Sequence, residues 1–234
     1  MLKIFRIMIT KIYNIDCLQY MAGLPDNTFA LAIADPPYGI GANKMTLGNG
    51  HKRVYRGADD WDKSAPAPEF FDELRRVSRN QIIFGANHFV ETFHVNSPCW
   101  IVWDKGTGDN DFADCELAWT SFDSPVRKFF KSWVGANAKE RTDAERIHPT
   151  QKPVALYYWI LQRFAQQGDA IFDPMAASQS SRIAAYKAGF DYVGCEIDET
   201  FFRTGCERFE RECFGITHTK KGHTLQQTQL NFES

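Results

Sequence analysis

The last third of the chain contains the pattern that most constrains its fold. Two apolar runs, DAIFDP at 169–174 and DYVGCEID at 191–198, have the length and composition of buried strands. Between them, SSRIAAYKAG at 180–189 has the character of a helix that ends at Gly189. Strand, helix and strand in succession form a βαβ unit, whose two strands are parallel. We therefore expect a parallel sheet covered by helices.

Further segments extend this pattern toward the N-terminus. The other expected strands are KIYNI (11–15), FALAIA (29–34), NQIIF (80–84) and CWIVWDK (99–105). The other expected helices are 16–24, 67–78, 153–167, which begins at Pro153 and is followed by Gly168, and 199–213. Segments 115–122 and 126–134 are expected to pair as a hairpin, and 39–64 to form a long loop. The predicted fold is α/β, with a doubly wound, mostly parallel sheet in a single domain with inserted loops.

Composition narrows the class of protein. A chain of 234 residues with 44 % apolar residues is sufficient for one core. No run approaches the ~20 apolar residues that span a bilayer, and the N-terminal MLKIFRIMITKIY lacks a signal-peptide cleavage site. The six cysteines form no CxxC pair and no zinc-ligand spacing. We expect a reduced, cytoplasmic protein with no membrane segment and no bound metal.

The charges are unevenly distributed along the chain. A net charge of −2 argues against a broadly basic nucleic-acid binder, but the 44–56 and 127–146 segments are locally basic. A basic stripe on a neutral protein is sufficient to contact phosphates, and a solvated face explains the same pattern equally well. The candidate phosphate-contacting residues are Lys44, Lys52, Arg53, Arg56, Arg127, Lys128 and Lys131.

Small residues and an acid mark one candidate binding site. The strand that ends at Asp173 continues through small residues into a helix, and Glu196 closes the next strand, 23 residues after Asp173. An acid about 20 residues beyond such a turn holds a ribose hydroxyl in dinucleotide-type sites. A nucleoside-bearing cofactor therefore fits this half of the chain. A plain helix-entry loop and a surface glutamate would give the same pattern.

A second strand end carries the stretch ADPPYG at 34–39. Proline has no N–H and holds the preceding residue extended, so Asp35 and a backbone carbonyl are free to face a ligand. These two acceptors lie beside the flat ring of Tyr38. The complementary ligand is an amino group on an aromatic ring, such as the exocyclic amine of a nucleobase that has left its duplex. The alternative, a plain tight turn, accounts less well for this combination after a buried strand.

Three segments resemble the amino-directed DNA methyltransferases, the N6-adenine and N4-cytosine group that uses S-adenosylmethionine. They are IYNIDCLQYMAGLPDNTFALAIADPPYG (12–39), IHPTQKPVALYYWIL (147–161) and IFDPMAASQSSRIAAYKAGFDYVGCEID (171–198). Their order, with the catalytic motif first and the cofactor motif last, is similar to the circularly permuted β class. The resemblance implies a Rossmann-like methyltransferase fold over 1–215, with a catalytic half at about 10–135 and a cofactor half at about 147–213. The remaining residues, 216–234, are expected to form a flexible tail.

The resemblance also implies roles for individual residues. Asp35, Pro36 and Tyr38 would hold the target base, and Pro37 would fix the turn. The cofactor would lie between Asp16 near its adenine, Glu196 at its ribose and, around the methionine part, Thr150, Lys152, Phe172, Asp173, Pro174, Ala177 and Ser178, with His148 in support. Asn87 and Trp103 are candidates for the base pocket, and core packing explains them equally well.

The cofactor segment departs from the family at two positions. Ala177 and Gln179 stand where the family has glycines, which allow positive φ or a close approach of the backbone to a ligand. The Gln179 side chain could project into the methionine site, or the loop could run differently. The two substitutions are compatible with a reduced affinity for the cofactor and with an inactive variant of the enzyme.

The resemblance implies methyl transfer from S-adenosylmethionine to the N6 amino group of adenine in double-stranded DNA, on a flipped-out base. Aspartate at the start of the DPPY motif favours adenine. The alternatives are an N4-cytosine or RNA methyltransferase, and a catalytically silent DNA-binding partner. A homodimer and a restriction endonuclease partner are left open.

Overall fold

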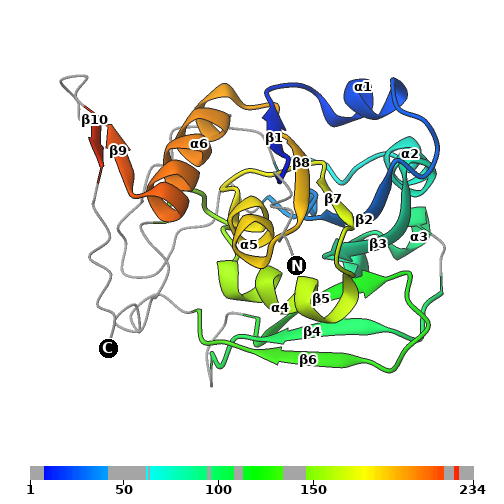
Figure 1. The fold of residues 1–234 in the computed structure, drawn as a ribbon. Helices are drawn as coiled ribbons and strands as arrows, with labels where there is room; N and C mark the ends of the chain where they lie inside the picture. The colour runs from blue at the N-terminus through cyan, green and yellow to red at the C-terminus, as the bar shows by residue number, and fades with distance from the viewer. Residues whose placement is uncertain are drawn as a thin grey trace, which may run out of the picture.

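A computed structural model describes residues 8–41, 62, 64–93, 96–107, 113–133, 146–218 and 224–226, which form an α/β fold around one large sheet (Figure 1). Its strands are β1 (Thr10–Tyr13), β2 (Phe29–Ala34), β3 (Ser78–Phe84), β4 (Trp100–Asp104), β5 (Cys115–Thr120), β6 (Arg127–Phe130), β7 (Ala170–Asp173) and β8 (Asp191–Cys195). The helices are α1 (Cys17–Ala22), α2 (Pro68–Val77), the 3-10 turn η2 (Ala86–His88), α3 (Val90–Phe93), α4 (Val154–Phe164), α5 (Ser180–Ala188) and α6 (Glu199–Phe214).

The strand order is β1-β8-β7-β2-β3-β5-β4-β6. Adjacent strands from β1 to β3 are parallel, and β5 runs antiparallel to both β3 and β4. Strand β2 of the N-terminal half pairs with β7 of the C-terminal half, so both halves build one sheet. The sheet confirms the predicted doubly wound, mostly parallel architecture.

The predicted hairpin between 115–122 and 126–134 is wrong. Strand β4 lies between the two segments, because it pairs antiparallel with β5 on one edge and parallel with β6 on the other. Both edges of β5 are occupied, by β3 and β4, so β6 pairs with the outer edge of β4. Strands that follow one another in the sequence are therefore not neighbours in this part of the sheet.

The central strands alternate their side chains between two cores. On β2, Leu31 and Ile33 join the core under α4, α5 and α6, whereas Ala32 and Ala34 join the core under α1 and α2 (Figure 1). This alternation is the period-two pattern of a strand covered on both faces. Every residue of β2 is buried, which explains why its sequence is a continuous apolar run.

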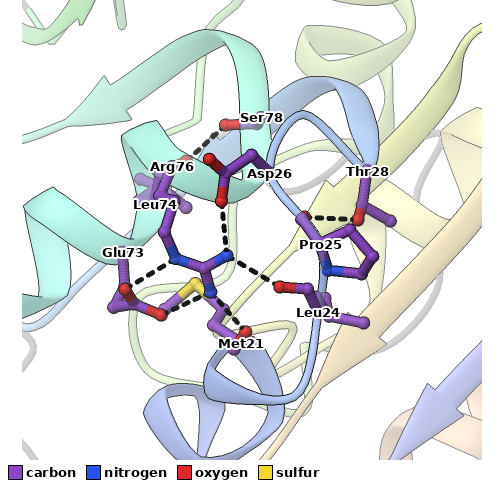
Figure 2. A network of polar contacts seen from close by, with 9 residues as sticks. All are labelled: Met21, Leu24, Pro25, Asp26, Thr28, Glu73, Leu74, Arg76 and Ser78. Atoms are coloured by element: carbon purple, nitrogen blue, oxygen red, sulfur yellow. Dashed lines mark hydrogen bonds and ion pairs between the residues drawn. The ribbon is translucent and has the colours of Figure 1, made fainter.

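An arginine of α2 secures the position of α1 (Figure 2). The Arg76 guanidinium donates to the carbonyls of Met21 (2.8 Å) and Leu24 (2.7 Å), and it pairs with Glu73 and Asp26. A cation at this position satisfies carbonyl groups that the end of a helix leaves without intrahelical partners. The contact matters for the site, since Asp16 lies at the N-terminal end of the same short helix.

Two boundaries differ from the sequence expectations. Helix α4 ends at Phe164 because Ala165 is extended, and Gly168, with φ 97°, lies in the turn before β7. Strands β9 (Ile216–His218) and β10 (Thr224–Gln226) pair antiparallel within the segment expected to be a flexible tail. Within the described residues, no helix is both long and apolar enough to span a membrane.

Candidate active site

The candidate site lies at the carboxyl ends of four neighbouring strands of the sheet. Strands β1, β8, β7 and β2 run parallel, so the residues that follow them meet at their carboxyl ends, where open α/β sheets bind ligands. A cavity of about 210 Å³ lies there. The predicted residues that line it are Asp16, Asp35, Pro36, Pro37, Tyr38, His148, Thr150, Lys152, Pro174, Ala177, Ser178 and Glu196.

The Asp35 carboxylate is held by two groups of the site. Lys152 Nζ lies 2.5 Å from Asp35 Oδ1, and the Tyr38 hydroxyl donates to the same oxygen at 3.0 Å. Burial raises the pKa of Asp35 above its ordinary value, and the Lys152 ammonium opposes this shift. The Lys152 ammonium therefore occupies the Asp35 carboxylate oxygen that the sequence analysis assigned to the amino group of a substrate.

Sequence reasoning missed Glu116, which is the second anionic partner of Lys152. Its Oε2 lies 3.2 Å from Lys152 Nζ, and its Oε1 lies 2.5 Å from Lys105 Nζ. Burial opposes ionisation of Glu116, but the two ammonium groups outweigh it and lower the pKa to about 2. Burial likewise opposes protonation of Lys152, and Asp35 and Glu116 overcome it and raise the lysine pKa. Two carboxylates and two lysines therefore form a compact, charge-balanced cluster.

Tyr38 is fixed by its surroundings. Its ring stacks on His88 with centroids 5.0 Å apart, and its other contacts include Gly85, which has φ 66°. A Cβ on Gly85 would lie 2.1 Å from the Tyr38 ring, so this position requires glycine on steric grounds as well as for its backbone. The next residue of the turn, Gly39, donates to Asp62 Oδ1 at 2.9 Å. Neither Gly85 nor Asp62 carried a signal in the sequence, because both are far from the motif.

The loop after β7 keeps a glycine-like backbone despite its substitutions. Ala177 has φ 41° and Gln179 has φ 58°, both in the left-handed region. The Gln179 side chain does not project into the cofactor site, which was one of the alternatives that the sequence left open. This side chain is fully buried against α6, where its Nε2 donates to the Phe202 carbonyl at 3.1 Å. The altered loop therefore leaves the cavity open at this position.

Two further acids, Glu196 and Asp16, line the cavity. Glu196 accepts from the backbone N–H groups of Ala177 and Asp198, each at 2.8 Å, which fixes it between the loop and α6. Asp16 caps α1 by accepting from Gln19 N at 3.0 Å. A carboxylate offers about four lone-pair positions, so each acid retains capacity for a ligand hydroxyl or amine. The exposed side chain of Ile197, which the sequence analysis did not single out, also lines the cavity.

Two predicted cofactor residues do not line the cavity. Phe172 is fully buried and stacks on Phe29 with centroids 4.6 Å apart, so it belongs to the core. Asp173 accepts from Met175 N at 3.0 Å and from Ser181 Oγ at 2.5 Å, so its contacts fix the loop rather than face a ligand. Burial raises the pKa of Asp173 to about 7.

His148 is another of the residues that line the cavity. Its ring packs edge-on against Phe201, and its Nδ1 lies 3.1 Å from Thr150 Oγ1. Burial, with help from the Arg146 and Lys152 cations, lowers the pKa of His148 to about 3. The imidazole is therefore neutral at physiological pH and supports the segment that carries Thr150 and Lys152.

The other candidate positions lie away from the cavity. Trp103 is fully buried and Asn87 is exposed on η2, and neither lines it. Arg127 and Lys128 are on β6 at the far edge of the sheet and Lys131 follows it, and Lys128 pairs with Asp104 at 2.7 Å. Lys44, Lys52, Arg53 and Arg56 lie outside the described residues. Across the described part of the chain, no group of three or more His, Cys, Asp or Glu side chains is arranged to hold a metal ion.

Comparisons with known proteins find similar sequences. The family model for DNA methylases of the N6/N4 type matches residues 103–207. The type II methyltransferase M2.MboI of Moraxella bovis is 23 % identical over 85 % of this chain and 87 % of its own. The putative methylase YubD of Escherichia coli K12 is also 23 % identical, over 82 % of this chain and 87 % of its own.

Solved structures match over nearly their whole length. TTHA0409 of Thermus thermophilus, a putative DNA modification methylase, superposes with a TM-score of 0.56 at 16 % identity, covering 93 % of this chain and 99 % of that one. M1.HpyAVI in complex with S-adenosylmethionine superposes with a TM-score of 0.55 at 18 % identity, covering 85 % and 98 %.

The protein belongs to the α/β class. Its sheet, with a cavity at the carboxyl ends of the strands, has a Rossmann-like methyltransferase fold. Within that class, the chain is similar in sequence to the amino-directed DNA methyltransferases.

Proposed function

We propose that this protein transfers a methyl group from S-adenosylmethionine to the N6 amino group of adenine in double-stranded DNA. One observation carries the proposal: Asp35 to Tyr38 and the loop at 174–178 line the same cavity. An acceptor for an aromatic amine thus faces the part of the fold that would hold the methyl donor.

The residues present fit S-adenosylmethionine. Glu196 and Asp16 suit the ribose and adenine ends, and the cationic Lys152 with Thr150 suits the methionine carboxylate. Gln179 is turned away from the cavity, so the substitutions in the loop are compatible with binding. When bound, the cofactor supplies an electrophilic methyl group.

The chain itself would orient the amine. Asp35 and the neighbouring Pro36 carbonyl accept its two N–H groups, while Tyr38 stacks on the base. These acceptors stabilise the positive charge that develops on the nitrogen, and proximity to the methyl group supplies much of the remaining acceleration. Asp35 then accepts the proton that the methylated amine releases. Lys152 must leave Asp35 for this exchange, and Glu116 is the second carboxylate already within its reach.

Aspartate in place of serine at position 35 supports adenine over cytosine, as the family resemblance implies. The type II relative supports a role in restriction–modification, in which the protein would act on DNA in the cytoplasm. Gln179, buried away from the cavity, speaks against a catalytically silent partner.

The test is transfer of a labelled methyl group from S-adenosylmethionine to unmethylated genomic DNA, RNA or protein. We expect label in DNA. In Asp35→Ala, the rate of transfer should fall by about a hundredfold or more, while the cofactor still binds. Label in RNA or protein alone would assign another substrate. Binding of DNA with no transfer to any substrate would establish the silent partner instead.

A further inference from the structure

The cofactor loop adopts a backbone that its sequence disfavours. Residues other than glycine are unfavourable in the left-handed region, yet Ala177 and Gln179 both lie there. Surrounding contacts must therefore hold the loop in this shape. Glu196 accepts from Ala177 N, and further contacts come from residues of α6 that lie more than twenty positions along the chain.

A missing side chain on α6 makes room for the loop. Gly205 is buried inside α6, and a Cβ built on it would lie 2.6 Å from Gln179 Nε2 and 2.9 Å from the Ala177 carbonyl oxygen. The space left by this glycine, the Gly205 notch, is where the Gln179 side chain packs. Beside the notch, Gln179 Nε2 lies 3.4 Å from Cys206 Sγ, and Gln179 Oε1 accepts from Arg182 Nη1 at 2.9 Å.

A second contact from α6 holds the same loop. The fully buried Arg208 guanidinium donates to the Ser178 carbonyl at 2.9 Å and to Ser180 Oγ at 2.8 Å. Its own charge is paired with Glu212 at 2.7 Å. Ser178 and Ala177 both line the cavity, so α6 acts directly on residues of the candidate cofactor site.

We propose that Gly205 is a positioning residue for cofactor binding: its notch receives Gln179 and so keeps the 174–179 loop in the shape that binds S-adenosylmethionine. The inference rests on the proposed function, because it concerns the same cofactor site. It explains how the chain accommodates glutamine at a position where the family that it resembles has glycine. Gly205 and Gln179 are then a coupled pair, and neither touches the reacting atoms.

The test is a mutant cycle measured by calorimetric titration of S-adenosylmethionine. The proteins are the natural chain, Gly205→Ala, Gln179→Gly, the double variant and, as a control, Gly23→Ala. Gly23 has φ −86°, and an added Cβ there meets nothing closer than 3.7 Å. The titrations are made at a temperature where circular dichroism shows every variant folded, and the melting temperature of each is recorded.

We expect Gly205→Ala to weaken binding by about tenfold or more, because the loop backbone must shift, while Gly23→Ala stays close to the natural chain. The double variant should recover part of this loss, since Gln179→Gly removes the two contacts with Gln179 and leaves the Ala177 carbonyl oxygen, 2.9 Å from the added Cβ. Such a rescue would not follow if Gly205 merely stabilised α6.

Three outcomes would overturn the inference. Alanine is the better helix former, so unchanged affinity with a raised melting temperature in Gly205→Ala would show that the notch has no role. Binding by Gln179→Gly but not by the natural chain would show that the glutamine is not accommodated. Absence of binding in every protein would refute the proposed function itself, and the inference with it; in the first outcome the natural chain binds, which separates the two failures.

Discussion

The ring of Tyr38 depends on a glycine of the neighbouring strand end. Gly85 leaves no room for a Cβ, because the ring lies against its backbone. Gly41 has a similar φ of 71°, but nothing lies within 4 Å of a Cβ placed there. The two positions therefore separate steric contact with the ring from the cost of the backbone conformation.

Gly85→Ala is expected to displace the Tyr38 ring and lower the rate of methyl transfer by about a hundredfold, with cofactor affinity little changed. Gly41→Ala should share the strain of about 1–2 kcal/mol but retain the rate. Steady-state kinetics and calorimetry of both variants make the comparison. Equal rates in the two variants would show that the contact with Tyr38 is unimportant.

Glu116 is expected to stabilise the fold through its two lysines. Glu116→Gln removes one negative charge from the cluster and leaves the Lys105 and Lys152 ammonium groups without the carboxylate that they share, so the free energy of unfolding should fall by about 1–3 kcal/mol. Denaturant titration measures the change, with the exposed Glu91→Gln as control. A loss no larger than that of the control would contradict the cluster's role.

At the scale of elements, the sequence predicted what local burial decides. The periodicity of α2 and the continuous apolar run of β2 follow from the surfaces that they bury, so both were predicted within a few residues. The pairing of β5 with β4, and the direction of the Gln179 side chain, depend on partners distant in the sequence. Asp35 and Glu196 were found because each follows a strand end, and Thr150 and Lys152 were found through the family resemblance. Glu116 lies within β5 and carried neither signal.

Helix α1 is short, and its C-terminal carbonyls depend on Arg76. Arg76→Gln should therefore increase amide hydrogen exchange in α1 and weaken cofactor binding, because Asp16 begins this helix. Arg75→Gln is the matched control, since Arg75 pairs with Asp72 of its own helix. Unchanged exchange in α1 after loss of Arg76 would show that the packing of α1 alone holds it.

For the whole molecule, the buried neutral His148 links stability to pH. Its pKa is about 3 in the folded protein and about 6.5 when unfolded, so the unfolded state binds the proton first as the pH falls. This group therefore lowers stability progressively from about pH 6.5 to pH 3, by up to about 1.4 kcal/mol per pH unit. His148→Asn should lose less stability than the natural chain over this range. Parallel curves from denaturant titrations at several pH values would contradict the assignment.

The central claim is that the two halves of the molecule form one site: the acceptor groups that follow β2 and the cofactor loop that follows β7 act together on adenine. Mass spectrometry of nucleosides from DNA treated with the protein and S-adenosylmethionine tests it most directly. The account predicts N6-methyladenine with the natural chain and its loss in Asp35→Ala. N4-methylcytosine as the product, or N6-methyladenine undiminished in Asp35→Ala, would contradict it.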